Sequence, residues 1–218
     1  MTDRVKKAAA VFDMNGTLVD DIAFHFQAWR ELASELGVAM DEALFQSLNG
    51  LKNVDIFPRL LGRAVSDDEI ARLGGKKEER YRALFAPHLA PVAGALELLD
   101  RLRAEGIRLA VASSAPPDNR AMVLDGLDLR RRFELVVEAE RLPGKPAPDV
   151  FLAAAQGLGV DPAACVAFED AVNGVVSAKA AGMFVVGITT NVPAEELVRA
   201  GASLTAKDFT TLPPSLFT

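Results

Sequence analysis

The chain of 218 residues lacks the features typical of secreted, membrane and nucleic-acid-binding proteins. It has one cysteine, so no disulfide can form within it, and a reducing compartment fits. We expect neither a secretion signal nor a membrane span, because the sequence shows no signal pattern and no sufficiently long apolar run. Acidic residues outnumber basic ones by 30 to 24, and the net charge of −6 argues against nucleic-acid binding. We therefore expect a cytoplasmic protein with no membrane or nucleic-acid partner.

The sequence does contain short apolar runs typical of buried parallel strands. Helical patterns at 91–104, 149–158 and 173–181 come before the second, fourth and fifth of these runs. Such alternation is typical of a doubly wound sheet, so we predict a Rossmann-like three-layer α/β fold with a parallel sheet. The expected strands are residues 8–12, 107–112, 135–137, 165–168 and 184–188.

The long segment between the first two expected strands has helical patterns and no convincing strand. Residues 21–36 carry an apolar face typical of an amphipathic helix. Ser66 and Glu69 form a capping-box pattern that begins a second, charged helix. We expect an inserted helical cap whose two short connections act as hinges. The expected division is 1–18 and 91–218 for the core and 19–90 for the cap.

Polar residues come at the carboxyl ends of four expected strands. In a parallel sheet these ends meet at one edge, where open α/β sheets bind their ligands. A carboxylate, a hydroxyl, a lysine and an acidic pair that converge there predict a catalytic crevice. In chain order the residues are Asp13, Ser113 with Ser114, Lys145, and Glu169 with Asp170.

These side chains suit phosphoryl transfer. Asp13 can attack phosphorus and form an aspartyl-phosphate. Ser113 and Lys145 can bind the oxygens of the transferred group, whose charge requires donors and cations around it. Because Mg²⁺ prefers oxygen ligands, we also expect Mg²⁺ in this crevice. The expected metal-site residues are Asp13, a backbone carbonyl near Asn15, Asp170 and, through Lys145 or the water ligands, Glu169.

The run Asp13-x-Asn15-Gly16-Thr17 resembles the first motif of the haloacid dehalogenase-like phosphotransferase superfamily. Ser113, Lys145 and the pair Glu169-Asp170 are similar to its other three motifs, in order and spacing. The runs that resemble its β-phosphoglucomutase-like branch are His25-x-x-x-Trp29, Lys145-Pro146-Ala147-Pro148-Asp149 and Glu169-Asp170-x-x-x-Gly174.

The resemblance implies a magnesium-dependent phosphatase. Its substrate would be a small phosphorylated metabolite, with a sugar phosphate favoured, and the intermediate an aspartyl-phosphate on Asp13. The resemblance also implies a mobile cap that closes over the site and determines substrate specificity. Lys77 and Asn119 are similar to the branch's cap lysine and phosphate-contacting asparagine. The full set of expected substrate-binding residues is Trp29, Lys52, Lys77, Ser114 and Asn119.

Asn15 departs from the superfamily pattern. The superfamily has an aspartate there, which acts as general acid and base, and an amide cannot transfer a proton. We therefore expect Asn15→Asp to raise turnover by on the order of 10²-fold. His25 lies at the expected seam between cap and core. It is our candidate to carry the proton because of its near-neutral reference pKa, with packing in the cap as the alternative.

The other departure lies after the first cap helix. The mutase of this branch has a lysine and an arginine after that helix, and the arginine binds the distal phosphate of the substrate. This chain has asparagines at the matching positions, Asn49 and Asn53. Their presence favours a monophosphate hydrolase over a phosphomutase. A phosphate-binding or regulatory protein that lost turnover through Asn15 is the third alternative. The sequence does not distinguish a natural Asn15 from an introduced one.

Overall fold

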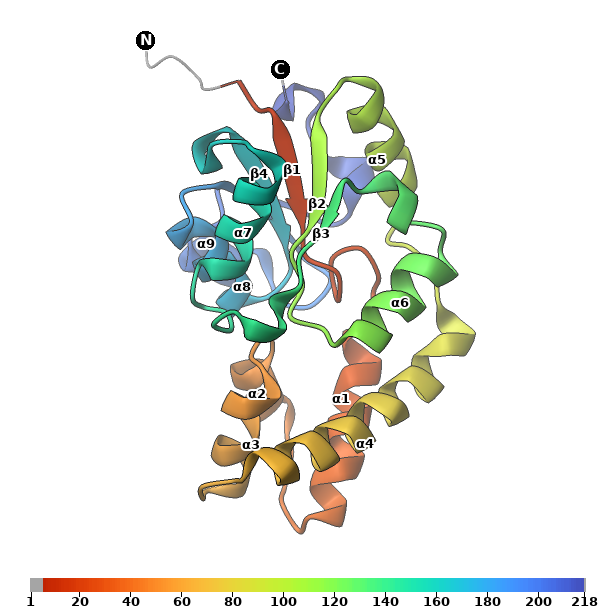
Figure 1. The fold of residues 1–218 in the computed structure, drawn as a ribbon, viewed down its shortest axis with the longest axis vertical. Coiled ribbons are helices and arrows are strands. Elements are labelled where there is room, and N and C mark those ends of the chain that lie inside the picture. The colour runs from red at the N-terminus through yellow and green to blue at the C-terminus, as the bar shows by residue number, and fades with distance from the viewer. Residues whose placement is uncertain (1–5, 218) are drawn as a thin grey trace.

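The computed structural model describes residues 6–217, which form a parallel sheet flanked by helices and a helical subdomain below its carboxyl edge (Figure 1). Within this range the strand order is β3-β2-β1-β4-β5-β6, and all neighbours are parallel. The strands are β1 (Ala9–Phe12), β2 (Arg108–Val111), β3 (Leu135–Val136), β4 (Cys165–Glu169), β5 (Phe184–Ile188) and β6 (Leu204–Ala206).

Side chains of β1 alternate between two hydrophobic cores, one on each face of the sheet. Ala10 and Phe12 belong to the core covered by α5 (Ala95–Ala104) and α6 (Pro117–Gly126). Ala9 and Val11 belong to the opposite core. That core is covered by α7 (Asp149–Leu158), α8 (Val172–Ala180) and α9 (Ala194–Ala200). The predicted three-layer α/β fold is confirmed.

Several element boundaries differ from the sequence-based predictions. The helix expected at 91–104 begins at Ala95, because Gly94 adopts a left-handed φ of 78° that a helix cannot contain. The sequence did not predict β6, α6 or α9. Short 3₁₀ helices complete the described structure, at Ala86–His88, Arg130–Arg132, Ala139–Arg141, Pro162–Ala164, Phe209–Thr211 and Pro214–Leu216.

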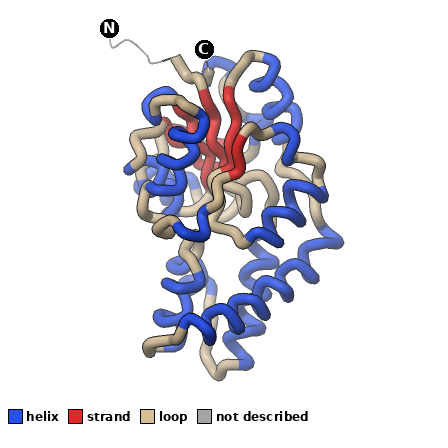
Figure 2. Tube along the Cα trace, in the orientation of Figure 1, coloured by secondary structure: helices blue, strands red, loops and turns tan. Residues whose placement is uncertain are grey.

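The segment between β1 and β2 forms a separate group of helices with its own hydrophobic core (Figure 2). Half of the expected capping box is present, since Ser66 Oγ accepts from Glu69 N at 3.3 Å. The Glu69 carboxylate binds Arg63 instead, at 2.7 Å. We call this group the helical subdomain. It comprises α1 (Ile22–Glu35), α2 (Glu42–Leu48), α3 (Asn53–Leu61) and α4 (Asp67–Phe85).

The two connections between the helical subdomain and the sheet lie side by side. Val19 and Pro91 form an antiparallel bridge, and Val92 N donates to Leu18 O at 2.9 Å. Both connections therefore leave from one point below β1. Among residues 6–217 no helix combines the length and apolarity needed to cross a membrane.

Candidate active site

Strand register brings the polar residues together at the carboxyl edge of the sheet. Phe12, the last residue of β1, pairs with Val111 on one side and Phe168 on the other. Asp13 continues the ladder by donating its N–H to Phe168 O at 3.0 Å. As a result, Asp13 lies between the ends of β2 and β4, which carry Ser113 and Glu169.

Lys145 bridges two carboxylates from its position in the loop before α7. Its Nζ donates to Asp13 Oδ1 at 2.6 Å and also to Glu169 Oε1. All three side chains are buried. Although burial alone lowers the pKa of Lys145, the Asp13 and Glu169 carboxylates raise it overall, so the ammonium stays charged.

The carboxylates at this edge outnumber the cations beside them. Asp13, Glu169 and Asp170 each offer an oxygen within 4.8 Å of the other two, and among residues 6–217 Lys145 alone is paired with this cluster. Burial raises the pKa of Asp13 to about 7, against the opposing effect of Lys145. Burial and the neighbouring carboxylates likewise raise the pKa of Asp170 well above its usual value.

The donor set fits a divalent cation. When all three carboxylates are ionised and Lys145 is charged, a net charge of −2 is left, which a divalent cation would neutralise in place of the protons that the raised pKa values of Asp13 and Asp170 otherwise favour. Asp170 Oδ1 accepts from Thr17 Oγ1 at 3.1 Å, but the buried Oδ2 has no partner among the described residues. Carboxylate oxygens are the ligands that Mg²⁺ prefers. The residues that could hold it are therefore Asp13 and Asp170, with Glu169 beside them.

Two glycines allow the acidic pair to approach the backbone. A Cβ at Gly16, whose φ is 74°, would lie well under 3.0 Å from the Asp170 carboxylate. A Cβ at Gly174 in α8 would collide in the same way with the Glu169 carboxylate. Glu169 Oε2 uses the space to accept from the N–H groups of Asp170 and Ala171, at 3.0 and 3.1 Å.

A cavity of about 310 Å³ separates this edge from the helical subdomain. Ser113 is buried in its wall, and its Oγ accepts from Ala115 N at 3.1 Å. Every site residue expected from the sequence lines the cavity, although the role of each stays a prediction. They are Asp13, Asn15, His25, Trp29, Lys52, Lys77, Ser113, Ser114, Asn119, Lys145, Glu169 and Asp170.

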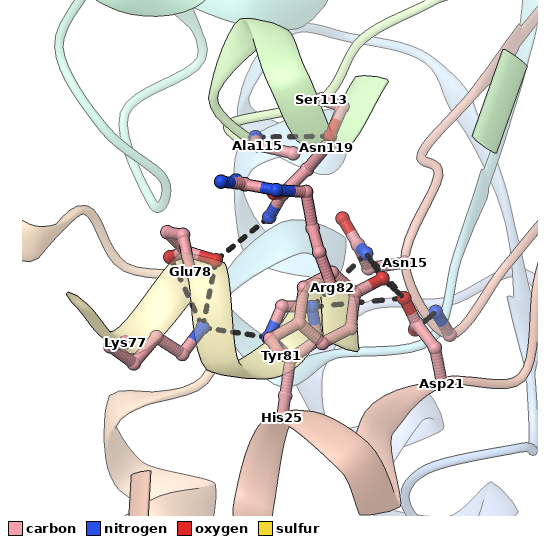
Figure 3. A network of polar contacts seen from close by, with 11 residues as sticks. Asn15, Asp21, His25, Lys77, Glu78, Tyr81, Arg82, Ser113, Ala115 and Asn119 are labelled. Atoms are coloured by element: carbon pink, nitrogen blue, oxygen red, sulfur yellow. Dashed lines mark hydrogen bonds and ion pairs between the residues drawn. The ribbon is translucent and has the colours of Figure 1, made fainter. Parts of the chain in front are cut away.

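Lys77 and Asn119 take part in a buried polar network (Figure 3). Lys77 Nζ lies 3.1 Å from Glu78 Oε1, and Asn119 Nδ2 donates to Glu78 Oε2 at 2.7 Å. Arg82 Nη1 donates to Asn119 Oδ1 at 2.9 Å. The sequence-based reasoning missed Glu78, because a charged run on a helix gives no sign that one of its members is buried.

Contacts within the protein occupy the side chains of Lys52 and Trp29, both of which were expected to bind substrate. Lys52 Nζ donates to three backbone carbonyls, those of Ala139, Glu140 and Leu142, and so ties α3 to the loop after β3. The Trp29 ring is packed in the subdomain core, and its centroid is 5.3 Å from that of Phe57. Trp29 is 5% exposed, so little of its side chain is available to a ligand.

His25 lies between Lys77 and Tyr81, with 13% of its side chain exposed. Its ring stacks on Tyr81 with centroids 3.7 Å apart, and its Nδ1 lies 2.7 Å from Lys77 Nζ. Burial, together with the Lys77 charge, lowers the pKa of His25 well below its usual 6.5. This direction argues against a titration near neutral pH, which the reference pKa of an exposed imidazole suggested, and the role of His25 stays a prediction.

Asn15 contacts a carboxylate that the sequence-based reasoning treated only as the start of a helix. Asn15 Nδ2 donates to Asp21 Oδ2 at 2.5 Å and to Tyr81 Oη at 3.2 Å. Burial raises the pKa of Asp21 to about 6, although hydrogen bonds from Tyr81, Asn15 and Gly16 oppose the rise. The sequence signal that could have indicated this contact is Asp21 itself, an acidic residue directly after Asp20 and six positions after Asn15.

Comparisons with known proteins agree with this geometry. A family model described as haloacid dehalogenase-like hydrolase matches residues 7–182. β-Phosphoglucomutase of Bacillus subtilis is 34% identical over 209 residues, covering 90% of this chain and 91% of that protein. Fructose-1-phosphate phosphatase YqaB of Escherichia coli is 35% identical over 184 residues, covering 83% and 96%.

Solved structures show the same likeness. The crystal structure of β-phosphoglucomutase from Clostridium difficile superposes with a TM-score of 0.84 at 27% identity, covering 95% of this chain and 93% of that one. The family match spans well over half of this chain, and both curated relatives exceed 30% identity across most of it. The chain belongs to the haloacid dehalogenase-like hydrolase family, in its β-phosphoglucomutase-like branch.

Proposed function

We propose that the protein is a magnesium-dependent phosphatase that hydrolyses a small phosphomonoester through an aspartyl-phosphate on Asp13. A sugar phosphate is the favoured substrate class, because relatives include phosphatases named for fructose 1-phosphate and hexitols. The observation that carries the proposal is the placement of Asp13. Its carboxylate is held by Lys145 at the floor of a cavity, beside two further carboxylates.

In the proposed reaction the Asp13 carboxylate forms a bond to phosphorus as the ester bond to the alcohol breaks. The departing oxygen takes up a proton from water and leaves as the alcohol. Water then attacks phosphorus, the bond to Asp13 breaks, and inorganic phosphate leaves. Lys145 and Ser113 donate hydrogen bonds to the phosphoryl oxygens in both steps.

Asp13 and Asp170 would hold Mg²⁺, which supplies positive charge against the phosphoryl oxygens when bound. Glu169 orients Lys145 and is itself fixed by the two backbone N–H groups at the start of the following turn. The leftover negative charge and the unpartnered Asp170 Oδ2 support this assignment.

We expect slow turnover because neither Asn15 nor His25, which are in contact and line the cavity, can supply the proton. Asn15 can hold an oxygen by a hydrogen bond but cannot transfer a proton, and His25 is held neutral by burial and Lys77. A placed general acid contributes about 10²–10⁴ in rate. We therefore expect this protein to turn over more slowly, by roughly that factor, than superfamily members with an aspartate at this position.

Hydrolysis is favoured over a phosphomutase because, among the described residues that line the cavity, no cation is free to bind a second phosphate. Lys77 is paired with Glu78, and Lys52 is bound to backbone carbonyls. The rest of the subdomain wall of the cavity is mainly apolar, formed by Ile22, Met40, Phe45, Leu48, Leu51 and Ile56. The mutase alternative rests on the similarity to β-phosphoglucomutases. The other alternative, a catalytically weakened phosphate-binding or regulatory protein, rests on Asn15.

The test is phosphate release from hexose 1-phosphates, hexose 6-phosphates and fructose 1-phosphate, with Mg²⁺ and with excess chelator. Isomerised sugar phosphate is measured in the same samples, and Asp13→Asn is the matched control. Phosphate release that requires both Asp13 and the metal would support the proposal. Isomerisation without net phosphate release would establish the mutase instead, and saturable binding without either product would establish the binding protein.

A further inference from the structure

Asp21 is a fully buried carboxylate that occupies an unusual position for its residue type. It stands at the N-cap of α1, yet its side chain makes no capping hydrogen bond to that helix. An N-cap aspartate normally accepts from the helix's own N–H groups, and this contact contributes about 0.5–2 kcal/mol. Asp21 instead points away from α1 and toward the motif that contains Asn15.

Three donors surround the Asp21 carboxylate. Gly16 N donates to Oδ1 at 2.9 Å, while Asn15 Nδ2, at 2.5 Å, and Tyr81 Oη donate to Oδ2. An ionised carboxylate can only accept hydrogen bonds. The nitrogen of the Asn15 amide, rather than its oxygen, must therefore face Asp21. Figure 3 shows the Asn15 oxygen pointing away from Asp21.

This contact fixes which way the Asn15 amide faces. The oxygen and nitrogen of an asparagine side chain exchange places by rotation about one bond, and only the surrounding partners select one orientation. Tyr81 Oη donates to Asp21 and so is left to accept from Asn15 Nδ2, which reinforces the same choice. Asn15 itself lines the cavity, so its oriented oxygen is available to a ligand there.

We infer that Asp21 is a positioning residue that fixes the Asn15 amide, and that the two residues form a matched amide–carboxylate pair. The inference rests on the proposed phosphoryl transfer. With Nδ2 bound to Asp21, Asn15 Oδ1 accepts a hydrogen bond from the water that attacks phosphorus and so orients it. The proton that this water loses leaves with inorganic phosphate or passes to bulk water, and none passes to the amide.

The pair changes what a substitution at position 15 should do. In Asn15→Asp two carboxylates would meet where the amide and Asp21 are now 2.5 Å apart, in a buried site, and like charges in such a place repel strongly. The gain in turnover expected from the sequence did not take Asp21 into account. The exchange Asn15→Asp with Asp21→Asn keeps one amide and one carboxylate in contact, with the donor and acceptor reversed.

The experiment compares the unaltered protein, Asn15→Asp, Asp21→Asn and the double exchange, by kcat, KM and Tm. Asp21→Asn leaves Asn15 with a partner that can both donate and accept, so we expect kcat to fall about 10-fold with little change in KM. Asn15→Asp should not raise kcat and should lower Tm. The double exchange should recover Tm and exceed both single variants in kcat by about 10-fold or more. The exposed neighbour provides the matched control, Asp20→Asn, which should leave all three quantities unchanged.

Two results would overturn the inference. One is a single Asn15→Asp variant whose kcat and Tm equal or exceed those of the double exchange. The other is an Asp21→Asn variant whose kcat stays within about twofold of the unaltered protein. An inactive unaltered protein would instead refute the proposed function and the positioning role with it. The recovery of Tm in the double exchange would then still decide whether the two residues form a matched pair.

Discussion

Gly174→Ala should disrupt the site although it adds a single methyl group. Gly174 lies in the first turn of α8, and a Cβ there would collide with both carboxylate oxygens of Glu169. Glu169 must then move. It would leave Lys145, and it would leave the N–H groups of Asp170 and Ala171 without their acceptor.

The magnitude follows from opposing contributions. Each buried N–H left without a partner costs about 1–3 kcal/mol, so the two together cost about 2–6 kcal/mol. Replacing glycine by alanine within a helix stabilises it by about 1 kcal/mol. The net expectation is a loss of about 3 kcal/mol of unfolding free energy. For a chain of this size, that corresponds to a fall in Tm of roughly 6–12 °C.

The matched control is Gly75→Ala, because Gly75 is an exposed helical glycine of α4 with no atom within 4 Å of its would-be Cβ. That variant should raise Tm slightly and leave activity unchanged. Thermal unfolding and phosphate release are measured on both variants. We expect Gly174→Ala also to lower kcat by more than about 10-fold, since Lys145 loses Glu169. A Gly174→Ala protein with the Tm and kcat of the Gly75→Ala control would refute the reasoning.

Three further expectations follow from the same structure. Millimolar Mg²⁺ should raise the Tm of the unaltered protein, because a ligand of the folded state stabilises it, and Asp170→Asn should abolish the rise. The His25 imidazole should show no titration by NMR between pH 6 and 8. Its folded-state pKa lies well below the 6.5 of the unfolded chain, so the folded state binds fewer protons than the unfolded state. The free energy of unfolding should therefore decrease as pH falls below 6.5. Lys52→Met should speed hydrogen exchange in the segment 139–142, whose carbonyls Lys52 holds, whereas Lys76→Met at an exposed ion pair should not.

Much of the fold could be predicted because buried parallel strands are short, apolar and bounded by turns. β6 could not be predicted in this way, since it has three residues and two of them are only half-buried. The start of α5 was misplaced because Gly94 is left-handed and because Pro91, before it, pairs with Val19, a contact between residues distant in sequence. Such pairings leave no periodic signal in either segment.

The strand-end residues of the candidate site could also be placed from the sequence, because parallel register brings strand ends to one edge. Contacts that reach across from the helical subdomain could not. Tyr81 and Asp21 meet although they are 60 positions apart, and burial sets the pKa of His25, which no motif reports. The contacts that orient the Asn15 side chain therefore come from residues outside the motif that contains it.

The most direct test of the central claim is chemical trapping of the phosphorylated aspartate. The protein is quenched during turnover of a substrate that it hydrolyses, and borohydride then reduces any acyl phosphate to the alcohol before peptide mass spectrometry. We expect the reduced residue at Asp13 only when substrate is present, and not in Asp13→Asn. Active protein with no reduced residue at position 13, or with the modification on another carboxylate, would contradict the account.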